Sequence, residues 1–283
     1  MNNMSLSEKI TYSTVRIISK YSDGTIGSGT GFIVNLLRDE EKGTVYPAII
    51  TNNHVVENSV ETAFDFCKAD ENGNPIDTSS FTVVINNGNG WFSHPNKNID
   101  LSFLPLKVIL EEISNKRERI YYAALDTDLI ADDSFLSSLN AIEDVIMVGY
   151  PQGIMDTYNH KPIIRRGITA THPKNDYMGK PEILLDIAAY PGSSGSPVFL
   201  LNEGSYHNGN TLNVGTRIKL IGILYAGPQY TAIGEIKFYS LPLRPVPAIN
   251  IPFNLGIAIK AKEIFEIEKY IISETEKMGK NNG

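Results

Sequence analysis

The chain has 283 residues, 42% of them hydrophobic and 20% charged, and a formal net charge of −7. This acidic balance argues against a nucleic-acid partner, because phosphate binding requires clustered Lys and Arg. The single cysteine, Cys67, excludes an intrachain disulfide framework and suits a reducing compartment. No apolar run reaches membrane-spanning length, and the first residues lack the pattern of a signal peptide. We therefore expect a soluble, cytoplasmic protein without a membrane partner.

The first part of the chain predicts a series of β-strands separated by turns. The predicted strands are rich in β-branched and aromatic residues. They cover residues 11–19, 30–34, 45–51, 62–68, 81–85 and 101–106. The segment ENGNP (71–75) predicts a hairpin turn, and its acidic residues lack the spacing of a calcium-binding loop. We expect neither a bound metal nor a cofactor.

A charged segment, LKVILEEISNKRERI (106–120), interrupts this pattern, and we interpret it as a linker. Strand-like runs resume beyond it, at residues 144–150, 163–170, 182–189, 197–201, 217–227 and 254–259. Between residues 261 and 278, apolar side chains recur at helical spacing (Ile264, Ile267, Ile271 and Met278). The pattern predicts an all-β fold of two packed six-stranded antiparallel β-barrels, residues 1–118 and 119–283, with a C-terminal α-helix.

One histidine stands in a context that suits a general base. His54 follows the predicted strand YPAIIT directly, in the segment TNNHVVE, where a strand supports it and solvent can reach it. The other four histidines, His94, His160, His172 and His207, lie in polar segments flanked by Gly or Pro, and we expect them to be solvated. Taken alone, His54 is better explained as an incidental residue beside a helix-capping Asn.

An acidic residue and a serine cluster elsewhere in the chain favour a catalytic role for His54. Asp100 begins the apolar run DLSFLPL, where a buried carboxylate needs a hydrogen-bonded or charged partner. The segment YPGSSGSPVFL (190–200) contains more serine and glycine than a hairpin turn requires. Its glycines allow a tight turn in which backbone N–H groups converge beside an exposed hydroxyl. A nucleophile and an oxyanion hole could thus come from one turn.

Together these segments resemble the chymotrypsin/trypsin-like serine peptidases, especially the disulfide-free bacterial branch that includes the HtrA-type proteases. The family's Thr-Ala-Ala-His is matched by TNNH (51–54), its Asp-Ile-Ala-Leu by DLSF (100–103), and its Gly-Asp-Ser-Gly-Gly-Pro by GSSGSP (192–197). The segments GSGTGFIV, VGYPQG and LIGILYAG also match the bacterial branch. The resemblance covers nearly the whole chain, and the three motifs occur in the family's order.

The resemblance implies a serine endopeptidase that acts through an acyl-enzyme. In the family's mechanism Ser194 attacks the scissile carbonyl, His54 accepts and returns the proton, and Asp100 orients the imidazole. The N–H groups of Gly192 and Ser194 would form the oxyanion hole. The substrate would be a protein or peptide.

The resemblance also places the primary specificity pocket. Its implied lining consists of Ala188, Ala189 and Tyr190, facing Tyr225, Ala226 and Gly227, with Gly256 near the floor. None of these residues is acidic, so we expect cleavage after small or medium apolar residues and no preference for Lys or Arg. The register of residues 225–227 could slip by one. We interpret Arg165 and Arg166 as outward-facing strand charges.

Two departures from the family bear on regulation. Ser193 stands where secreted members carry the Asp that receives a newly cut N-terminus, so we do not expect activation by N-terminal cleavage. The oxyanion loop would then be ordered by other contacts, such as an activating protein partner. HtrA-type proteins also carry peptide-binding modules after the protease domain, and we expect none here. A regulated intracellular protease with a narrow protein substrate fits these features.

Two alternatives to this assignment would require other features of the sequence. An α/β-hydrolase elbow, Gly-x-Ser-x-Gly, would need glycine at Ser196. A cysteine peptidase of this fold would need cysteine at the nucleophile position, whereas Cys67 lies in an early strand, as a buried small hydrophobe would. A catalytically silent member of the fold that serves as a protein-binding module stays open, although all three catalytic side chains and Gly192 are present.

Overall fold

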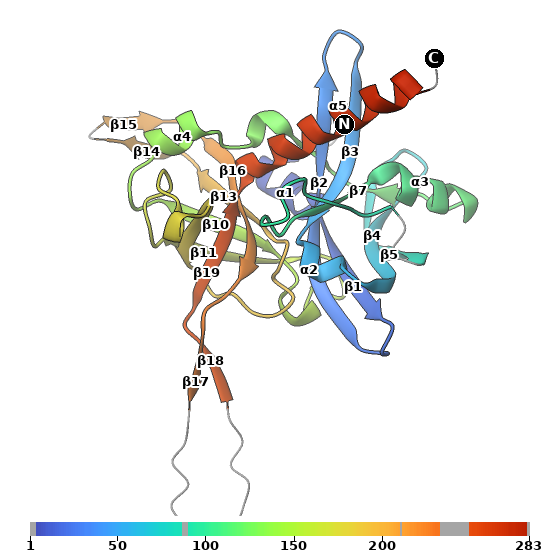
Figure 1. The fold of residues 1–283 in the computed structure, drawn as a ribbon, viewed down its shortest axis with the longest axis horizontal. Helices are drawn as coiled ribbons and strands as arrows, with labels where there is room; N and C mark the ends of the chain where they lie inside the picture. Colours follow the sequence, from blue (N-terminus) through green and yellow to red (C-terminus); the bar gives the residue numbers. More distant parts are fainter. Residues whose placement is uncertain (1–3, 87–89, 210, 233–248, 282–283) are drawn as a thin grey trace, which may run out of the picture.

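The computed structural model describes residues 4–86, 90–209, 211–232 and 249–281 of the chain. Two β-rich halves lie side by side, and the C-terminal helix runs across one end of both (Figure 1). None of the helices within the described ranges is both long and apolar enough to cross a lipid bilayer.

The first half is a nine-stranded sheet with a short helix before it. Its elements are α1 (Leu6–Ser13), β1 (Thr14–Tyr21), β2 (Ile26–Asp39), β3 (Thr44–Thr51), α2 (Asn53–Val56), β4 (Ser59–Ala69), β5 (Pro75–Asn86), β6 (Phe92–Ser93), β7 (Ser102–Pro105), α3 (Leu106–Asn115), β8 (Ile120–Tyr121) and β9 (Leu125–Asp126). The strand order is β5-β4-β1-β2-β3-β7-β6, with β8 paired to β4 and β9 to β2. All six predicted runs contribute a strand, and the turn predicted at residues 71–75 joins β4 to β5.

The strand expected at residues 11–19 is wrong for its first three residues. Residues 11–13 end helix α1 instead, and β1 begins at Thr14. Ser5 and Glu8 form a capping box in which each side chain accepts a hydrogen bond from the other residue's backbone N–H. This cap satisfies donors that a helix N-terminus otherwise leaves open, so the helix forms despite the β-branched residues that follow.

The segment 106–120 is not a linker. Its first ten residues form α3, and Leu106, Ile109 and Ile113 are buried. These side chains pack with Phe64 and Ile49 of the sheet in one apolar cluster. Despite its charged residues, this segment is therefore a helix that covers the apolar core of the first half. Strands β8 and β9 return to the first sheet after α3, while the boundary at 118/119 stays a prediction.

The second half contains a closed six-stranded antiparallel barrel, in the order β10-β11-β12-β19-β16-β13. The barrel strands are β10 (Asp144–Gly149), β11 (Ile163–Thr169), β12 (Glu182–Asp186), β13 (Pro197–Asn202), β16 (Arg217–Ala226) and β19 (Leu255–Lys260). Each corresponds to one of the six runs predicted for this half, which confirms a mostly β fold with a six-stranded antiparallel barrel and a C-terminal helix.

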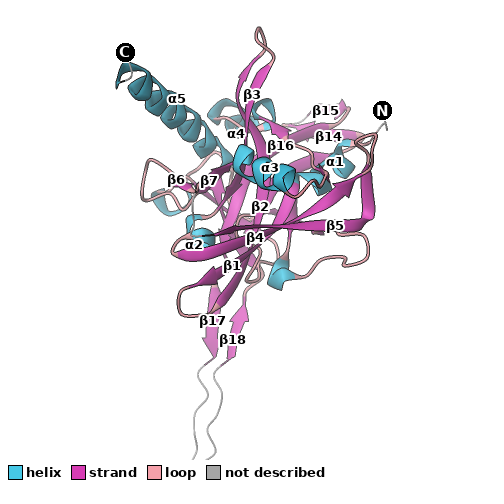
Figure 2. Ribbon diagram, turned by 90° about the vertical axis from the view of Figure 1, so that its right-hand side faces the viewer, coloured by secondary structure: helices cyan, strands magenta, loops and turns pink. Residues whose placement is uncertain are grey.

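Shorter helices and strands lie before, between and after the barrel strands along the chain. They are η1 (Thr127–Leu129), α4 (Asp133–Ser138), η2 (Pro151–Gly153), η3 (Tyr177–Gly179), β14 (Ser205–Asn208), β15 (Thr211–Val214), β17 (Gln229–Ala232), β18 (Ile249–Pro252) and η4 (Ala261–Glu263). Strands β17 and β18 form a two-stranded arm that projects away from the barrel (Figure 2). Helix α5 (Ile264–Asn281) begins where η4 ends.

A shared apolar core joins the two halves. It combines buried side chains of the first sheet, such as Phe32 and Leu101, with Phe199 and Ile223 of the barrel. Ile264 and Ile267 of α5 complete this core, as the helical spacing predicted. The candidate site described next is built from loops at this junction.

Candidate active site

His54 lies in the single turn of helix α2, immediately after strand β3. Its backbone N–H donates a hydrogen bond to Oδ1 of Asp100 at 3.0 Å. The neighbouring Asn52 side chain donates to the Asp100 carbonyl at 2.8 Å. The turn that carries the histidine is therefore bonded to Asp100, which lies two positions before the start of strand β7. Because β3 and β7 are adjacent strands, the sheet itself brings the two residues together.

The two side chains form a close pair. Nδ1 of His54 lies 2.5 Å from Oδ2 of Asp100, and the imidazole is about half exposed at 48%. An ionised carboxylate can only accept, so Nδ1 carries the proton and Nε2 is left as the basic nitrogen. Burial by itself raises the pKa of Asp100, but hydrogen bonds and charge attraction from His54 outweigh it and hold that pKa below its ordinary value. Asp100 thus stays ionised beside the imidazole.

The serine cluster forms a tight turn that brings Ser194 to the surface. Gly192 and Gly195 have φ values of +85° and +86°, which only glycine adopts easily. Ser193 and Ser196 are buried at 1% and 0% exposure, and within the described chain their hydroxyls make no hydrogen bond. Ser194 is the partly exposed member of the three. It is consequently the serine that a substrate can reach.

Packing sets this turn against the strand end that carries His54. A Cβ atom on Gly195 would lie 1.9 Å from the carbonyl oxygen of Thr30 and 2.5 Å from Oγ1 of Thr51. Thr51 is the last residue of β3, three positions before His54. No side chain larger than a hydrogen fits at Gly195, so the serine turn packs directly on the first half.

The Ser194 side chain bonds to the backbone of Tyr225, near the end of strand β16. The Ser194 hydroxyl donates a 3.4 Å hydrogen bond to the Tyr225 carbonyl. Burial first, then the Glu182 carboxylate, and to a smaller degree the Asp100 charge raise the pKa of Tyr225 above its ordinary range. Among the described residues, Ser194 bonds to this carbonyl rather than to His54.

The backbone around Gly192 leaves two donors unengaged. The carbonyl of Pro191 accepts a hydrogen bond from the N–H of Gln152 at 2.5 Å. In a trans peptide the following N–H, that of Gly192, points the opposite way. Within the described chain, neither this N–H nor that of Ser194 donates to a protein group. Both are available to a developing oxyanion.

A pocket of about 150 Å³ lies beside Ser194. Five of the residues predicted to line the specificity pocket line it: Ala189, Tyr190, Tyr225, Ala226 and Gly227. Pro191 and Leu224, which the sequence did not indicate, line it as well. Ala188 and Gly256 are not among the lining residues. A Cβ on Gly256 would meet Leu224 and Ala189, so Gly256 packs behind the wall.

Arg165 is not the outward strand charge that we expected. Its Nη1 donates to the carbonyl of Ala188 at 3.2 Å, and its guanidinium lies over the ring of Tyr190. Arg166, the next residue on β11, is exposed and pairs with Asp144 at 3.1 Å, as predicted for a surface charge. Neighbouring residues of a strand point to opposite faces, so only one of the two can face the 188–190 segment.

His94 is also not solvated, contrary to expectation. It is 3% exposed, its Nδ1 accepts from the N–H of Asn96, and its Nε2 lies 3.2 Å from the carbonyl of Glu263. With Nδ1 accepting, Nε2 carries the proton and donates. This histidine anchors the start of the C-terminal helix, and its nitrogens are engaged in that role.

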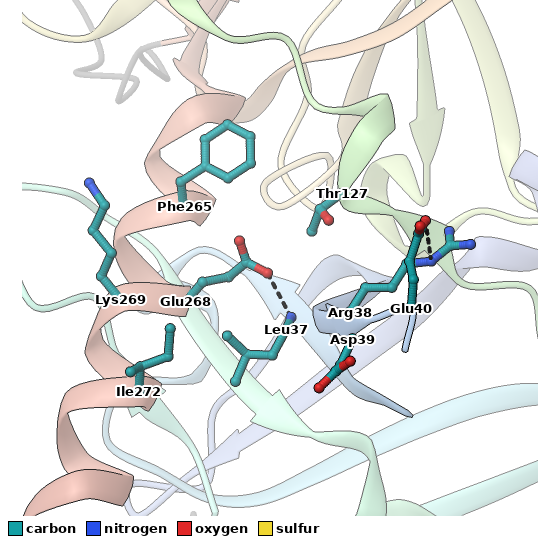
Figure 3. Close-up of a pocket in the computed structure, with 9 residues that line it drawn as sticks. All are labelled: Leu37, Arg38, Asp39, Glu40, Thr127, Phe265, Glu268, Lys269 and Ile272. Carbon is teal, nitrogen blue, oxygen red and sulfur yellow. Dashed lines mark hydrogen bonds and ion pairs between the residues drawn. The ribbon is translucent and has the colours of Figure 1, made fainter. Parts of the chain in front are cut away.

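A second pocket, of about 960 Å³, lies between strand β2 and helix α5 (Figure 3). In Figure 3, the side chain of Glu268 of α5 points toward Leu37, with Phe265 and Ile272 of the same helix above and below it. Leu37 lies at a register shift in the β2–β3 pairing, and its N–H donates to Oε1 of Glu268 at 2.6 Å. The nine lining residues include no histidine, cysteine or serine. At this pocket the bond between Leu37 and Glu268 joins strand β2 to helix α5.

The trypsin-like peptidase domain model matches residues 29–206, more than half of the chain. The chain belongs to the trypsin-like peptidase family. This membership confirms the predicted trypsin-like peptidase family. The match begins at Gly29 and covers His54, Asp100 and Ser194. No curated protein matches the chain.

Solved structures of similar fold include further proteases. Two structures of the HtrA-type protease AlgW with a tripeptide are 16% identical, with TM-scores of 0.48 and 0.46. They cover 93% and 94% of this chain, which spans only 61% and 62% of the AlgW chains. The thermostable serine protease AL20, from an extremophilic microorganism, is 12% identical with a TM-score of 0.48, covering 92% of this chain and 97% of its own.

Proposed function

We propose that this chain hydrolyses peptide bonds through an acyl-enzyme, with Ser194 as nucleophile, His54 as general base and Asp100 as the acid that orients it. The observation that carries the proposal is the 2.5 Å contact between His54 Nδ1 and Asp100 Oδ2. This contact leaves Nε2 basic and directed away from the carboxylate. Ser194, which is partly exposed, lies with two unengaged backbone donors in the turn that packs on the end of strand β3.

The residues act in sequence. The Ser194 hydroxyl leaves the Tyr225 carbonyl, gives its proton to Nε2 of His54, and its oxygen attacks the scissile carbonyl carbon. The N–H groups of Gly192 and Ser194 stabilise the oxyanion, typically by about 2.7–4 kcal/mol per donor. His54 then returns the proton to the leaving amine, and water hydrolyses the acyl-enzyme with the same base. Asp100 stays ionised throughout and stabilises the imidazolium.

The pocket beside Ser194 suits a small or medium apolar side chain. Its lining residues carry no charged group, and its volume is about 150 Å³. A Lys or Arg head group would be desolvated there without a partner, which costs several kcal/mol. We therefore propose cleavage after residues of the Ala, Val or Leu class.

We further propose a narrow protein substrate and control by a partner protein in the cytoplasm. An apolar pocket separates neighbouring aliphatic side chains by only about 1–3 kcal/mol, so the pocket alone cannot make the enzyme selective. An enzyme of that breadth would damage its own cell unless it were controlled. The single cysteine fits a reducing compartment.

Labelling with a fluorophosphonate tests the catalytic proposal, because only an activated serine reacts. We expect covalent modification of Ser194 in the native chain, identified by peptide mapping, and none in Ser194→Ala. Ser193→Ala, which removes a buried hydroxyl one position away, is the matched control and should label normally. A native chain that resists labelling under all conditions would favour the alternative, a protein-binding module.

A further inference from the structure

Thr30 is a fully buried threonine that bonds to the serine turn from the opposite half of the molecule. It lies in strand β2 and has 0% exposure. Its backbone N–H donates to the carbonyl of Ser194 at 2.8 Å. Its Oγ1 donates to the carbonyl of Gly192 at 3.1 Å and accepts from the N–H of Tyr150 at 3.0 Å. Every hydrogen-bonding group of this side chain is directed at the oxyanion loop or its support.

These contacts fix the peptide unit on one side of Gly192. Glycine adopts either sign of φ at little cost, so a peptide unit beside it can turn over unless its carbonyl is held. The Thr30 hydroxyl holds the carbonyl of the Gly192–Ser193 unit. The N–H of Gln152 holds the carbonyl of the preceding unit, Pro191–Gly192. Turning over the preceding unit would place a carbonyl where the oxyanion needs the Gly192 N–H.

The same hydroxyl also supports the turn that makes the second bond. Thr30 Oγ1 accepts from Tyr150, which directly precedes η2 (Pro151–Gly153). Gln152 sits in this turn with φ +53°, a left-handed conformation that a non-glycine residue adopts only when its surroundings hold it. Arg16 of β1 donates to the Gly153 carbonyl at 3.2 Å and is itself paired with Asp65. Thr30 therefore contributes to both hydrogen bonds that hold the backbone at Gly192. It makes the bond to the Gly192 carbonyl itself, and through Tyr150 it supports the turn whose Gln152 N–H bonds to the Pro191 carbonyl.

We propose that Thr30 is a positioning residue for the oxyanion hole: its hydroxyl holds the backbone on either side of Gly192 so that the Gly192 N–H faces the reacting carbonyl. The proposal rests on the function proposed above and adds a residue that does not touch the substrate. In this proposal, a side chain of the first half orders a loop of the second half. The order that we expected an activating partner to supply is thus built in part into the fold.

Three substitutions separate the hydroxyl from packing. Thr30→Val keeps the shape and removes the hydroxyl, leaving the Tyr150 N–H and the Gly192 carbonyl without that partner. Thr30→Ser keeps the hydroxyl. Thr62→Val is the matched control, because Thr62 is equally buried, lies in β4, and its hydroxyl has no hydrogen-bond partner among the described residues. Thermal melting of each variant checks that it folds, and Thr30→Ala replaces Thr30→Val if the latter does not.

The readout is the fluorophosphonate labelling rate, split into the limiting rate and the half-saturating probe concentration. We expect Thr30→Val to lower the limiting rate by about 10- to 100-fold, less than the 10²–10³ lost when an oxyanion donor is removed outright. The half-saturating concentration and the pH midpoint of labelling should not move, since His54 and the pocket are untouched. Thr30→Ser and Thr62→Val should stay within about threefold of the native rate. Equal losses in Thr30→Val and Thr30→Ser, or none in Thr30→Val, would overturn the proposal.

A crystal structure of Thr30→Val keeps the inference separate from the proposed function. If the native chain does not label, the proposed function fails, and the position of the Gly192 carbonyl still decides the inference. We expect that carbonyl to leave its native direction in Thr30→Val and to keep it in Thr30→Ser. An unchanged loop in Thr30→Val would show that the hydroxyl does not position it.

Discussion

The guanidinium group of Arg165 lies over the ring of Tyr190, with its central carbon 4.9 Å from the ring centre. The same group donates to the carbonyl of Ala188. One side chain from strand β11 thereby holds both ends of the segment 188–190, and two residues of that segment, Ala189 and Tyr190, line the pocket beside Ser194. Arg165, which the sequence predicted to be an outward-facing strand charge, instead supports one wall of this pocket.

Arg165→Ala should weaken substrate binding more than it slows chemistry. Loss of the cation–π contact, about 0.5–2 kcal/mol, and of the bond to Ala188 would let the wall move. We expect KM for peptide substrates to rise by about 3- to 10-fold with kcat little changed. Arg166→Ala, the exposed neighbour on the same strand, is the control and should leave KM unaltered. A fall in kcat with KM constant would show that Arg165 acts elsewhere.

Ser194→Ala should abolish hydrolysis, by about 10⁶ in kcat if the triad operates as a unit. Ser193→Ala and Ser196→Ala should retain most activity, because both hydroxyls are buried and lack partners among the described residues. Steady-state assays on a cleavable peptide compare the three. Activity that survives in Ser194→Ala and disappears in Ser193→Ala would shift the assignment by one residue.

Asp100 should make a pH-dependent contribution to stability. Its folded pKa lies below the ordinary value because of His54, so the ionised carboxylate stabilises the fold at pH values above the unfolded pKa, about 3.9. That contribution is lost as the pH falls through the lower, folded pKa. Asp100→Asn should therefore be less stable than the native chain at pH 7, and the difference should shrink below pH 4. Urea unfolding at a series of pH values measures it, and a difference that stays constant down to pH 3 would contradict the pairing.

Much of the fold follows from local pattern. The six barrel strands alternate or run apolar and are separated by Gly, Pro and Asn, so each was predicted at nearly its observed place. Residues 11–13 and 106–115 were misread for different reasons. The first belongs to a helix whose start is set by a capping box several residues upstream. The second shows helical spacing of Leu106, Ile109 and Ile113, which its charges concealed.

The site residues that stand in recognisable sequence motifs could be predicted. The residues whose role depends on packing between distant segments could not. His54, Asp100 and Ser194 could be chosen because each stands in a short segment with a recognisable role. Thr30 and Gln152 carry no such signal: one is a threonine between two glycines, and the other acts through its backbone. Arg165 was interpreted as a surface charge because a strand sequence does not reveal which neighbour it faces. Long-range contacts of this kind arise only when both halves are assembled.

Specificity and control can be tested together with an unbiased peptide library. The pocket residues Ala189, Ala226 and Gly227 are small, and no lining residue is charged, so we expect cleavage after small or medium apolar residues. Basic residues at that position should be cut poorly, because their desolvation costs several kcal/mol without a carboxylate partner. A strong preference for Lys or Arg would refute the pocket assignment. If a partner controls the enzyme, the isolated chain should degrade unfolded casein slowly. Rapid, indiscriminate degradation would show that the oxyanion loop needs no further ordering beyond the contacts of Thr30 and Gln152.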